Sequence, residues 1–383
     1  MTEISAAPLD PAGIEPALRP FGSSRTLPAA AYTDPAVLAW ERRHLFAGAW
    51  TCLGRLDELS AGCTQRAVTA GDVGVLLTFG ADGPRAFANV CRHRGHELLA
   101  DGETADRPAA VCPYHGWAYR LDGSLTTAPH MAGTAAFDPG ELGLVELPVA
   151  AWHGWLLVNA GPAAPPIESY TGALDGLLRP YNIGSLRLGA RHDYAVHANW
   201  KAIVENYQEC YHCPLIHPEL CRVSPPTSGD NWVLPGAWVG GTMDLREHAE
   251  TMSFDGRGPG TFIEGAPTRT ILYVALFPNL LISAHPDYVM THRLTPLAPD
   301  RTAIECSWYF PDAGIDPAYA VDFWDLTNRQ DWAACESVQR GLSSPHYVPG
   351  PLADNEDAVY QWIALVAAAY RDPVAALVAA SSA

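Results

Sequence analysis

The sequence lacks the features that would place the protein in a membrane or on a nucleic acid. No apolar run approaches the roughly 18 residues that a helix needs to span a bilayer. There is no extended basic stretch, and the net charge of −18 would repel a polyanion such as DNA or RNA. Residues 1–20 are rich in Pro and Ala and have no basic segment, so we expect a loose arm there rather than a secretory signal.

The cysteines do not form the spacing patterns that are typical of disulfide frameworks or zinc fingers. The nine cysteines are an odd number spread over 383 residues, and repeated Cys-x2-Cys pairs are missing. Without a secretory signal, this indicates a cytoplasmic protein with free thiols. No Gly-x-Gly-x-x-Gly turn opens a βαβ unit, so the sequence has no signature for binding a dinucleotide.

The length and composition predict two domains with a large core, at 48% hydrophobic and 17% charged residues. Residues 1–44 should be an arm and a helix that pack with the second domain. Residues 45–162 should form an all-β domain, and residues 163–383 an α+β domain. Strand-like runs cover 71–79, 85–90, 119–125 and 155–159, then 270–277, 280–284, 288–294 and 302–310. We predict a linker at residues 160–168. We predict helices at residues 170–179, 198–213, 321–342 and 357–379.

Two short motifs each pair one cysteine with one histidine, Cys91-Arg92-His93 and Cys112-Pro113-Tyr114-His115, separated by 18 residues. If both thiolates bind one iron and both imidazoles another, the four side chains hold a Rieske [2Fe–2S] cluster. Gly95 and Gly116 follow the motifs, as expected of tight turns that expose backbone N–H groups to sulfur. A Cys2His2 zinc site, or four unrelated side chains, is the alternative.

Extended to Cys91-Arg92-His93-Arg94-Gly95 and Cys112-Pro113-Tyr114-His115-Gly116-Trp117, the motifs resemble the Rieske signature of the α subunits of Rieske non-haem iron oxygenases. The resemblance covers residues 45–342. It implies a Rieske domain, a catalytic domain with a helix-covered antiparallel sheet, and a mononuclear Fe(II) that uses O2. Since this chain has no dinucleotide signature, NAD(P)H must be used by a separate reductase, expected to be a flavin and iron–sulfur protein. Members are typically homotrimers, and some have a second subunit. The cluster of one subunit passes electrons to the mononuclear iron of the next.

The segment 199–218 contains a candidate second iron site. His212 and His217 are five residues apart, about 500° of turn on an ideal helix, so a straight helix would not bring them to one face. Pro214 breaks the helix just after His212 and lets the chain bend. Two imidazoles and a carboxylate form the facial triad of mononuclear iron oxygenases. Cys210 and Cys213 leave open a zinc site or a redox pair.

A remote carboxylate must complete this triad, and Asp331 is the predicted ligand. It lies on the helix expected over 321–342 and, by the resemblance, at the place of the family's ligand aspartate. Glu336 and Asp325 are the alternatives. The competing interpretation is that Asp331 is a solvated helix carboxylate.

Glu209 is the candidate link between the two metal sites. It precedes His212 by three residues and so lies on its face of a helix. In the resembled family, a carboxylate here bridges the catalytic histidine and a cluster-ligand histidine of the neighbouring subunit. Many members have Asp, and the longer Glu should still reach. Glu205 is the competitor, and a surface role for Glu209 is the alternative.

The resemblance is nearest to choline, carnitine and glycine-betaine monooxygenases. It implies hydroxylation or oxidative N-demethylation of a quaternary amine held by cation–π attraction. Aromatic-ring dioxygenation is the alternative reaction, and a Rieske electron carrier or redox sensor is the non-enzymatic one. We do not assign His285 or His292 to the metal shell. The aromatic candidates for the pocket are Tyr207, Tyr211, Tyr273, Phe277, Trp308 and Trp324, although ordinary core packing is the favoured role of each.

Overall fold

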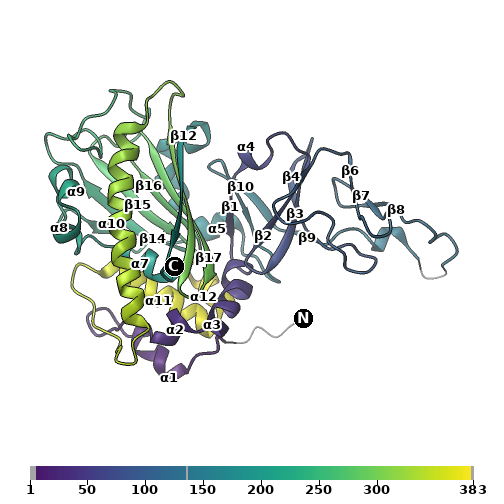
Figure 1. Ribbon diagram of the computed structural model, residues 1–383, viewed down its shortest axis with the longest axis horizontal. Coiled ribbons are helices and arrows are strands. Elements are labelled where there is room, and N and C mark those ends of the chain that lie inside the picture. The colour runs from purple at the N-terminus through teal and green to yellow at the C-terminus, as the bar shows by residue number, and fades with distance from the viewer. Residues whose placement is uncertain (1–5, 135–136, 381–383) are drawn as a thin grey trace. The chain divides into compact units, whose positions relative to one another are not determined.

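The computed structural model describes residues 6–134 and 137–380, and the chain folds as two units (Figure 1). One unit is Arg42–Ala164, and the described residues before and after it form the other. The divisions predicted after residues 44 and 162 lie within a few residues of these. Residues 1–5 of the expected arm lie outside the described part. No helix among the described residues is long and apolar enough to cross a membrane.

The Arg42–Ala164 unit consists of three antiparallel sheets with only short helical turns. Their strand orders are β5-β2-β3-β4-β9, β6-β7-β8 and β1-β11-β10. Because successive side chains of a strand point to opposite faces, β3 contributes to two cores. Leu76 packs with Phe87 in one, and Val75 and Leu77 pack with Leu156 in the other. The elements are η2 (Arg42–Phe46), β1 (Thr51–Arg55), α4 (Leu56–Leu59), β2 (Gln65–Ala70), β3 (Val73–Gly80), β4 (Gly83–Ala88), β5 (Thr104–Ala105), β6 (Ala109–Val111), β7 (Ala118–Arg120), β8 (Leu125–Thr127), η3 (Pro139–Glu141), β9 (Glu146–Leu147), β10 (Val149–Trp152) and β11 (Trp155–Val158).

The larger unit is built on a seven-stranded antiparallel sheet of order β12-β18-β17-β16-β15-β14-β13. Four strands fall on the runs predicted between 270 and 310. The sequence analysis missed the other three: β12 is a largely exposed edge strand, and β14 contains the adjacent Gly240 and Gly241, which weaken the strand signal. The strands are β12 (Arg187–Val196), β13 (Asp230–Asn231), β14 (Trp238–Asp244), β15 (Thr270–Leu276), β16 (Leu280–Ala284), β17 (Val289–Ala298) and β18 (Arg301–Phe310).

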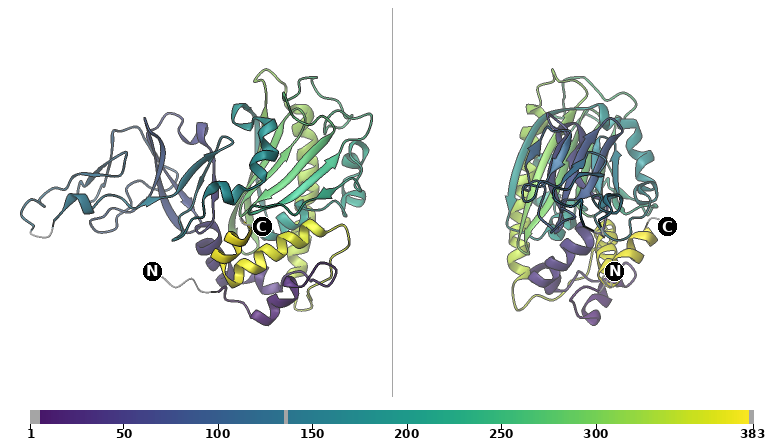
Figure 2. Two further views of the ribbon diagram at one scale, coloured as in Figure 1. Left: turned by 180° about the vertical axis from the view of Figure 1, so that it is seen from behind. Right: turned by 90° about the vertical axis from the view of Figure 1, so that its right-hand side faces the viewer.

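Helices pack on this sheet, and α10 is the longest of them. It lies across one face of the sheet, seen from the front in Figure 1 and from behind in Figure 2. Its buried positions, such as Ala320, Phe323, Trp324 and Thr327, follow the three-to-four spacing of an amphipathic helix. The helices are α1 (Pro11–Ile14), η1 (Glu15–Leu18), α2 (Ala29–Thr33), α3 (Pro35–Glu41), α5 (Ile167–Thr171), α6 (Leu174–Leu178), η4 (Arg179–Tyr181), η5 (Ile183–Ser185), α7 (Trp200–Tyr207), α8 (Cys213–Ile216), α9 (Pro218–Val223), α10 (Ala318–Leu342), α11 (Asp357–Arg371) and α12 (Pro373–Ala380).

The expectation of a loose N-terminal arm is wrong for its described residues. Ala7, Ile14 and Ala17 are buried, and the backbone N–H of Ala7 donates to the carbonyl of Tyr370 in α11 at 2.7 Å. The small apolar side chains of this Pro/Ala-rich stretch fill gaps beside the C-terminal helices. Composition alone did not show this, because Pro and Ala are as common in arms as in short packed turns.

A buried ion pair anchors α3 to α7, the helix that leads to the candidate site. Lys201 Nζ lies 2.6 Å from Glu41 Oε1, and both side chains are completely buried. Trp200 Nε1 donates to the other oxygen of Glu41 at 2.8 Å, and the Tyr370 hydroxyl donates to Oε1. A buried pair is tolerated when its remaining hydrogen-bonding capacity is used in this way, whereas removal of one partner strands the other charge.

We expect Glu41→Gln to lower the free energy of unfolding by about 3–5 kcal/mol, because it leaves Lys201 as an unpaired buried charge. The control is Asp175→Asn, which removes the exposed Asp175–Arg179 pair of the same unit. Its cost should stay below about 1 kcal/mol. Chemical denaturation measures the free energy of unfolding of both variants. If both lose the same amount, the buried pair stabilises the fold no more than the exposed pair does.

Candidate metal centres and the adjoining cavity

The two Cys/His motifs fold into equivalent loops. The Cys91 N–H donates to the carbonyl of His96, and the Cys112 N–H donates to that of Trp117, both at 2.8 Å. Gly95 and Gly116 close the loops with N–H bonds of 3.0 Å to the carbonyls of Cys91 and Cys112. Their φ values of 76° and 73° are in the left-handed region, which explains glycine at both positions.

These loops bring the four candidate cluster ligands to one place. Cys91 and Cys112 are buried in the same core, and the rings of His93 and His115 lie 4.6 Å apart between centroids. The Nδ1 atom of His93 is buried and has no hydrogen-bond partner among the described residues, as a ligand atom would be before its metal binds. Two soft thiols and two imidazoles on paired loops fit a [2Fe–2S] cluster of the Rieske type.

The sequence analysis missed Tyr119 as a partner of this site. Its hydroxyl lies 3.3 Å from the Cys91 sulfur and accepts a bond of 3.0 Å from the Arg92 N–H. Burial raises the pKa of Tyr119, and its hydrogen bond with Cys91 raises it further. A protonated phenol can therefore donate to the sulfur. No signal in the sequence connects a tyrosine on β7 to a cysteine 28 residues earlier.

The second candidate site begins where α7 ends earlier than predicted. The helix expected over 198–213 stops at Tyr207, well before Pro214. The Glu209 carboxylate accepts bonds from the backbone N–H groups of Tyr211 and His212, and this local capping competes with the helix. Short helices α8 and α9 then follow, each with a proline among its first two residues, and His217 lies at their junction.

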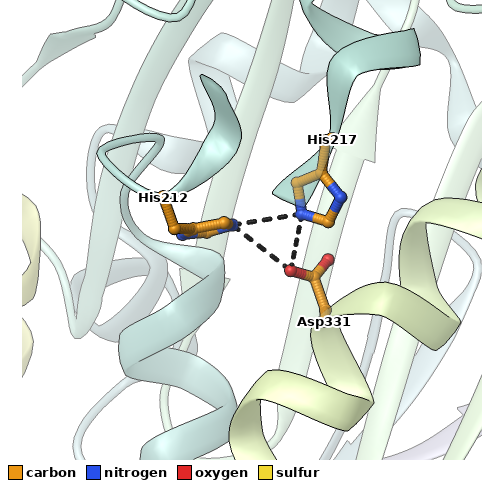
Figure 3. A group of neighbouring side chains, drawn as sticks. All are labelled: His212, His217 and Asp331. Carbon is orange, nitrogen blue, oxygen red and sulfur yellow. Dashed lines mark hydrogen bonds and ion pairs between the residues drawn. The ribbon is translucent and has the colours of Figure 1, made fainter. Parts of the chain in front are cut away.

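This bend and α10 together bring His212, His217 and Asp331 into contact, as Figure 3 shows. Asp331 Oδ1 lies 2.8 Å from His217 Nε2 and 3.3 Å from His212 Nε2, and the two Nε2 atoms are 3.2 Å apart. All three donor atoms lie within 4.8 Å of one another. Two imidazoles and one carboxylate in this arrangement suit a non-haem iron with open coordination positions.

The outer nitrogens of both imidazoles have partners of their own. His212 Nδ1 lies 2.6 Å from Glu209 Oε1, and His217 Nδ1 lies 2.7 Å from the side-chain oxygen of Gln330. Such partners hold the proton on Nδ1 and direct the Nε2 lone pair at a metal. The sequence analysis missed Gln330, although its place directly before Asp331 was a possible signal.

The protonation of the three side chains reflects their mutual contacts. Burial lowers the pKa of His212, but hydrogen bonds with Asp331 and Glu209 outweigh it and raise the pKa to about 9. Burial raises the pKa of Asp331, but hydrogen bonds from His212 and His217 have the larger effect. The pKa of Asp331 is therefore below its usual value. The carboxylate is therefore ionised, and a metal ion that binds here displaces a proton from His212.

The competing carboxylates are used elsewhere. Glu336 accepts the His197 N–H at 3.0 Å, and Asp325 accepts the Tyr194 hydroxyl at 2.7 Å. Glu205, the alternative to Glu209, accepts the Tyr32 hydroxyl at 2.8 Å, and burial raises its pKa to about 7. None of these three belongs to the cluster of donor atoms.

Cys210 and Cys213 form a disulfide beside this site, which agrees with the redox-pair alternative and not with the general expectation of free thiols. Their Cα atoms are 4.9 Å apart across the turn between Glu209 and α8. The other seven cysteines are free. The zinc alternative is not supported, because these sulfurs are bonded to each other and do not join the donor group.

A cavity of about 440 Å³ adjoins the three donors. Tyr207, Tyr273 and Trp324 of the predicted aromatic set line it. Phe277 and Trp308 are fully buried core residues away from the lining, and Tyr211 is exposed. His292 also lines the cavity but bonds to Asn328 at 3.2 Å, and burial lowers its pKa to about 4. His285 is buried and not a member of the donor group.

Comparison with known proteins gives two family matches. Residues 49–138 match the Rieske [2Fe-2S] domain, and residues 183–372 match the ring hydroxylating alpha subunit (catalytic domain). The glycine betaine monooxygenase oxygenase subunit of Chromohalobacter salexigens is 31% identical over 87% of this chain and 83% of its own length. The carnitine monooxygenase oxygenase subunit of Escherichia coli is 37% identical over 84% and 85%. A solved quaternary ammonium Rieske monooxygenase, described in terms of carnitine oxidation and inter-subunit electron transfer, is similar at a TM-score of 0.75 and 25% identity, over 96% of this chain and 100% of that one.

We expect Gln330→Leu to weaken Fe(II) binding at the second site about 10- to 100-fold, because His217 loses the partner that orients its ring. Arg329→Ala, at the adjacent exposed position, is the control and should bind iron as the parent protein does. Anaerobic titration with Fe(II) after iron removal measures both affinities. Unchanged affinity in Gln330→Leu would mean that the ring is held by packing alone.

Proposed function

This chain belongs to the Rieske non-haem iron oxygenases, as a ring-hydroxylating α subunit, and we propose that it oxidises an N-methyl group of a quaternary ammonium compound. It is an oxygenase component whose electrons come from a separate reductase. The observation that carries the proposal is the donor group of His212, His217 and Asp331 at the wall of an aromatic cavity. The relatives named for glycine betaine and carnitine support the substrate class.

The proposed reaction inserts one oxygen atom into a C–H bond of an N-methyl group. O2, two electrons and two protons give the hydroxymethyl compound and water. Breakage of the C–N bond then releases formaldehyde, a tertiary amine and a proton, unless the hydroxylated compound is the final product. Iron bound at His212, His217 and Asp331 would supply the site at which O2 is activated. The cluster held by Cys91, His93, Cys112 and His115 would supply electrons.

The chain's own residues then have defined tasks. Glu209 and Gln330 orient the two imidazoles through their Nδ1 atoms. The aromatic rings of Tyr273 and Trp324 lie 6.4 Å apart between centroids and offer π faces to a methylated cation. The cavity walls exclude water from the reacting methyl group, which limits unproductive use of O2.

Electron transfer between subunits is part of the same proposal. Glu209 is bonded to His212 and would bridge to a cluster-ligand histidine of a neighbouring copy, in a homotrimer. The inter-subunit electron transfer described for the solved relative supports this arrangement. Seven free cysteines agree with a cytoplasmic location. A flavin and iron–sulfur reductase is the expected redox partner, and neither a nucleic acid nor a membrane is expected.

The proposed activity is tested with the purified protein, a Rieske-type reductase, NADH and a panel of quaternary amines and arenes. We expect O2 uptake coupled to formaldehyde or a hydroxylated amine. His212→Ala should keep the visible spectrum of the cluster and lose turnover. A cis-diol from an arene would instead support the dioxygenase alternative, and a protein with an intact cluster but no mononuclear iron would support the electron carrier.

Glu209→Gln should keep both metals and slow the transfer of electrons from the cluster by at least about tenfold, because the neutral amide is a poorer bridge between the two histidines. Glu205→Gln is the matched control, since Glu205 bonds to Tyr32 rather than to His212. Reduced protein is mixed with O2 and substrate, and the reoxidation of the cluster is followed. Normal reoxidation in Glu209→Gln would refute the bridging role.

A further inference from the structure

The cavity beside the donor group is rich in acidic side chains. Its lining residues include five carboxylates, whereas no Lys or Arg occurs among the described residues that line it. Glu209 and Asp331 are engaged with the two histidines. The other three acids are not members of the donor group and lie on β13, just before α11 and at the first residue of α11: Asp230, Asp354 and Asp357.

Four basic side chains of the larger unit bind partners outside the cavity lining. Arg329 pairs with Asp325 at 2.7 Å, and Arg293 pairs with Glu305 at 2.9 Å. Lys201 is buried against Glu41. Arg269 donates to backbone carbonyls, among them that of Ala249 at 2.8 Å. A carboxylate that entered the cavity would therefore meet acids without a basic partner, and burial of an unpaired charge is costly.

The polar atoms of the lining suit an uncharged group instead. The Tyr273 hydroxyl is buried and has no hydrogen-bond partner among the described residues. Burial raises the pKa of Tyr273 well above its usual value, so the phenol keeps its proton. The Tyr207 hydroxyl already donates to the carbonyl of Ile282, and Trp324 Nε1 donates to the Tyr288 hydroxyl. Tyr273 thus offers a free donor and acceptor to an alcohol or amide.

We propose that Asp230, Asp354 and Asp357 select an ammonium cation whose far end is uncharged, such as an alcohol or an amide, and disfavour zwitterions that end in a carboxylate. The inference rests on the proposed function and narrows its substrate class. Glycine betaine and carnitine, for which two relatives are named, both end in a carboxylate. Choline, for which other relatives are named, ends in an alcohol, so the proposed substrate resembles choline in charge and differs from these two zwitterions.

The test compares two ligands that differ only at the far end, glycine betaine and betaine amide, with choline as a third. Calorimetric titration of the anaerobic holoprotein measures binding without turnover. We expect betaine amide and choline to bind at least about tenfold more tightly than glycine betaine, and the ratio to fall as salt screens the acids. Equal or tighter binding of glycine betaine, or no binding of either cation, would overturn the charge selection.

Turnover of the same compounds tests the proposed function separately. If the cations bind selectively but none is oxidised with reductase and NADH, charge selection stands and the proposed oxidation of quaternary amines fails. If glycine betaine is the better substrate and also binds more tightly, the proposed function stands and charge selection fails. The two ideas are therefore distinguished by comparing binding with product formation.

Two aspartate variants test whether the cavity acids cause this preference between the ligands. Asp354→Asn and Asp230→Asn should each reduce the preference for betaine amide over glycine betaine by about three- to tenfold, since each removes one negative charge from the cavity. Asp322→Asn, on the exposed side of α10 and outside the lining, changes net charge equally and should leave the ratio unchanged. An equal effect in all three variants would show that overall charge, and not the cavity, sets the preference.

Discussion

The meeting of two imidazoles and one carboxylate is the constraint that organises the larger unit. His212 and His217 come from one bend in the chain, whereas Asp331 arrives 114 residues after His217, on α10. The sheet holds α10 beside α7, and the buried Glu41–Lys201 pair holds α7 against α3. A metal site tolerates little error in the positions of its ligands. Metal binding at this site therefore depends on the packing of these helices.

The two candidate metal sites are built in different ways. The Cys/His loops repeat one local hydrogen-bonding pattern, with a cysteine N–H bonded five residues ahead and a left-handed glycine between. Each loop contributes one thiol and one imidazole, so two short motifs suffice. The histidine–aspartate site instead depends on long-range packing and on outer partners such as Gln330. A change in a distant core residue can therefore disturb the second site more readily than the first.

The cavity shows how one fold can serve several substrates. The donor group lies at the wall, and the acids of β13 and of the start of α11 are not members of it. If the proposed charge selection holds, substitutions in those segments change the charge of the acceptable ligand without touching the metal ligands. Relatives of this chain carry names for different amines, glycine betaine and carnitine among them.

The sequence by itself determined the paired Cys/His motifs, the strands between 270 and 310 and the long helix that carries Asp331, since these depend on local spacing and periodicity. It did not reveal edge strand β12, the early end of α7 or the packed N-terminal turns. Those depend on neighbours distant in the chain, or on the Glu209 carboxylate competing for backbone N–H groups. Only the tertiary structure decided which carboxylate meets the histidines, because Asp325, Asp331 and Glu336 share one helix and only their orientation toward its neighbours separates them.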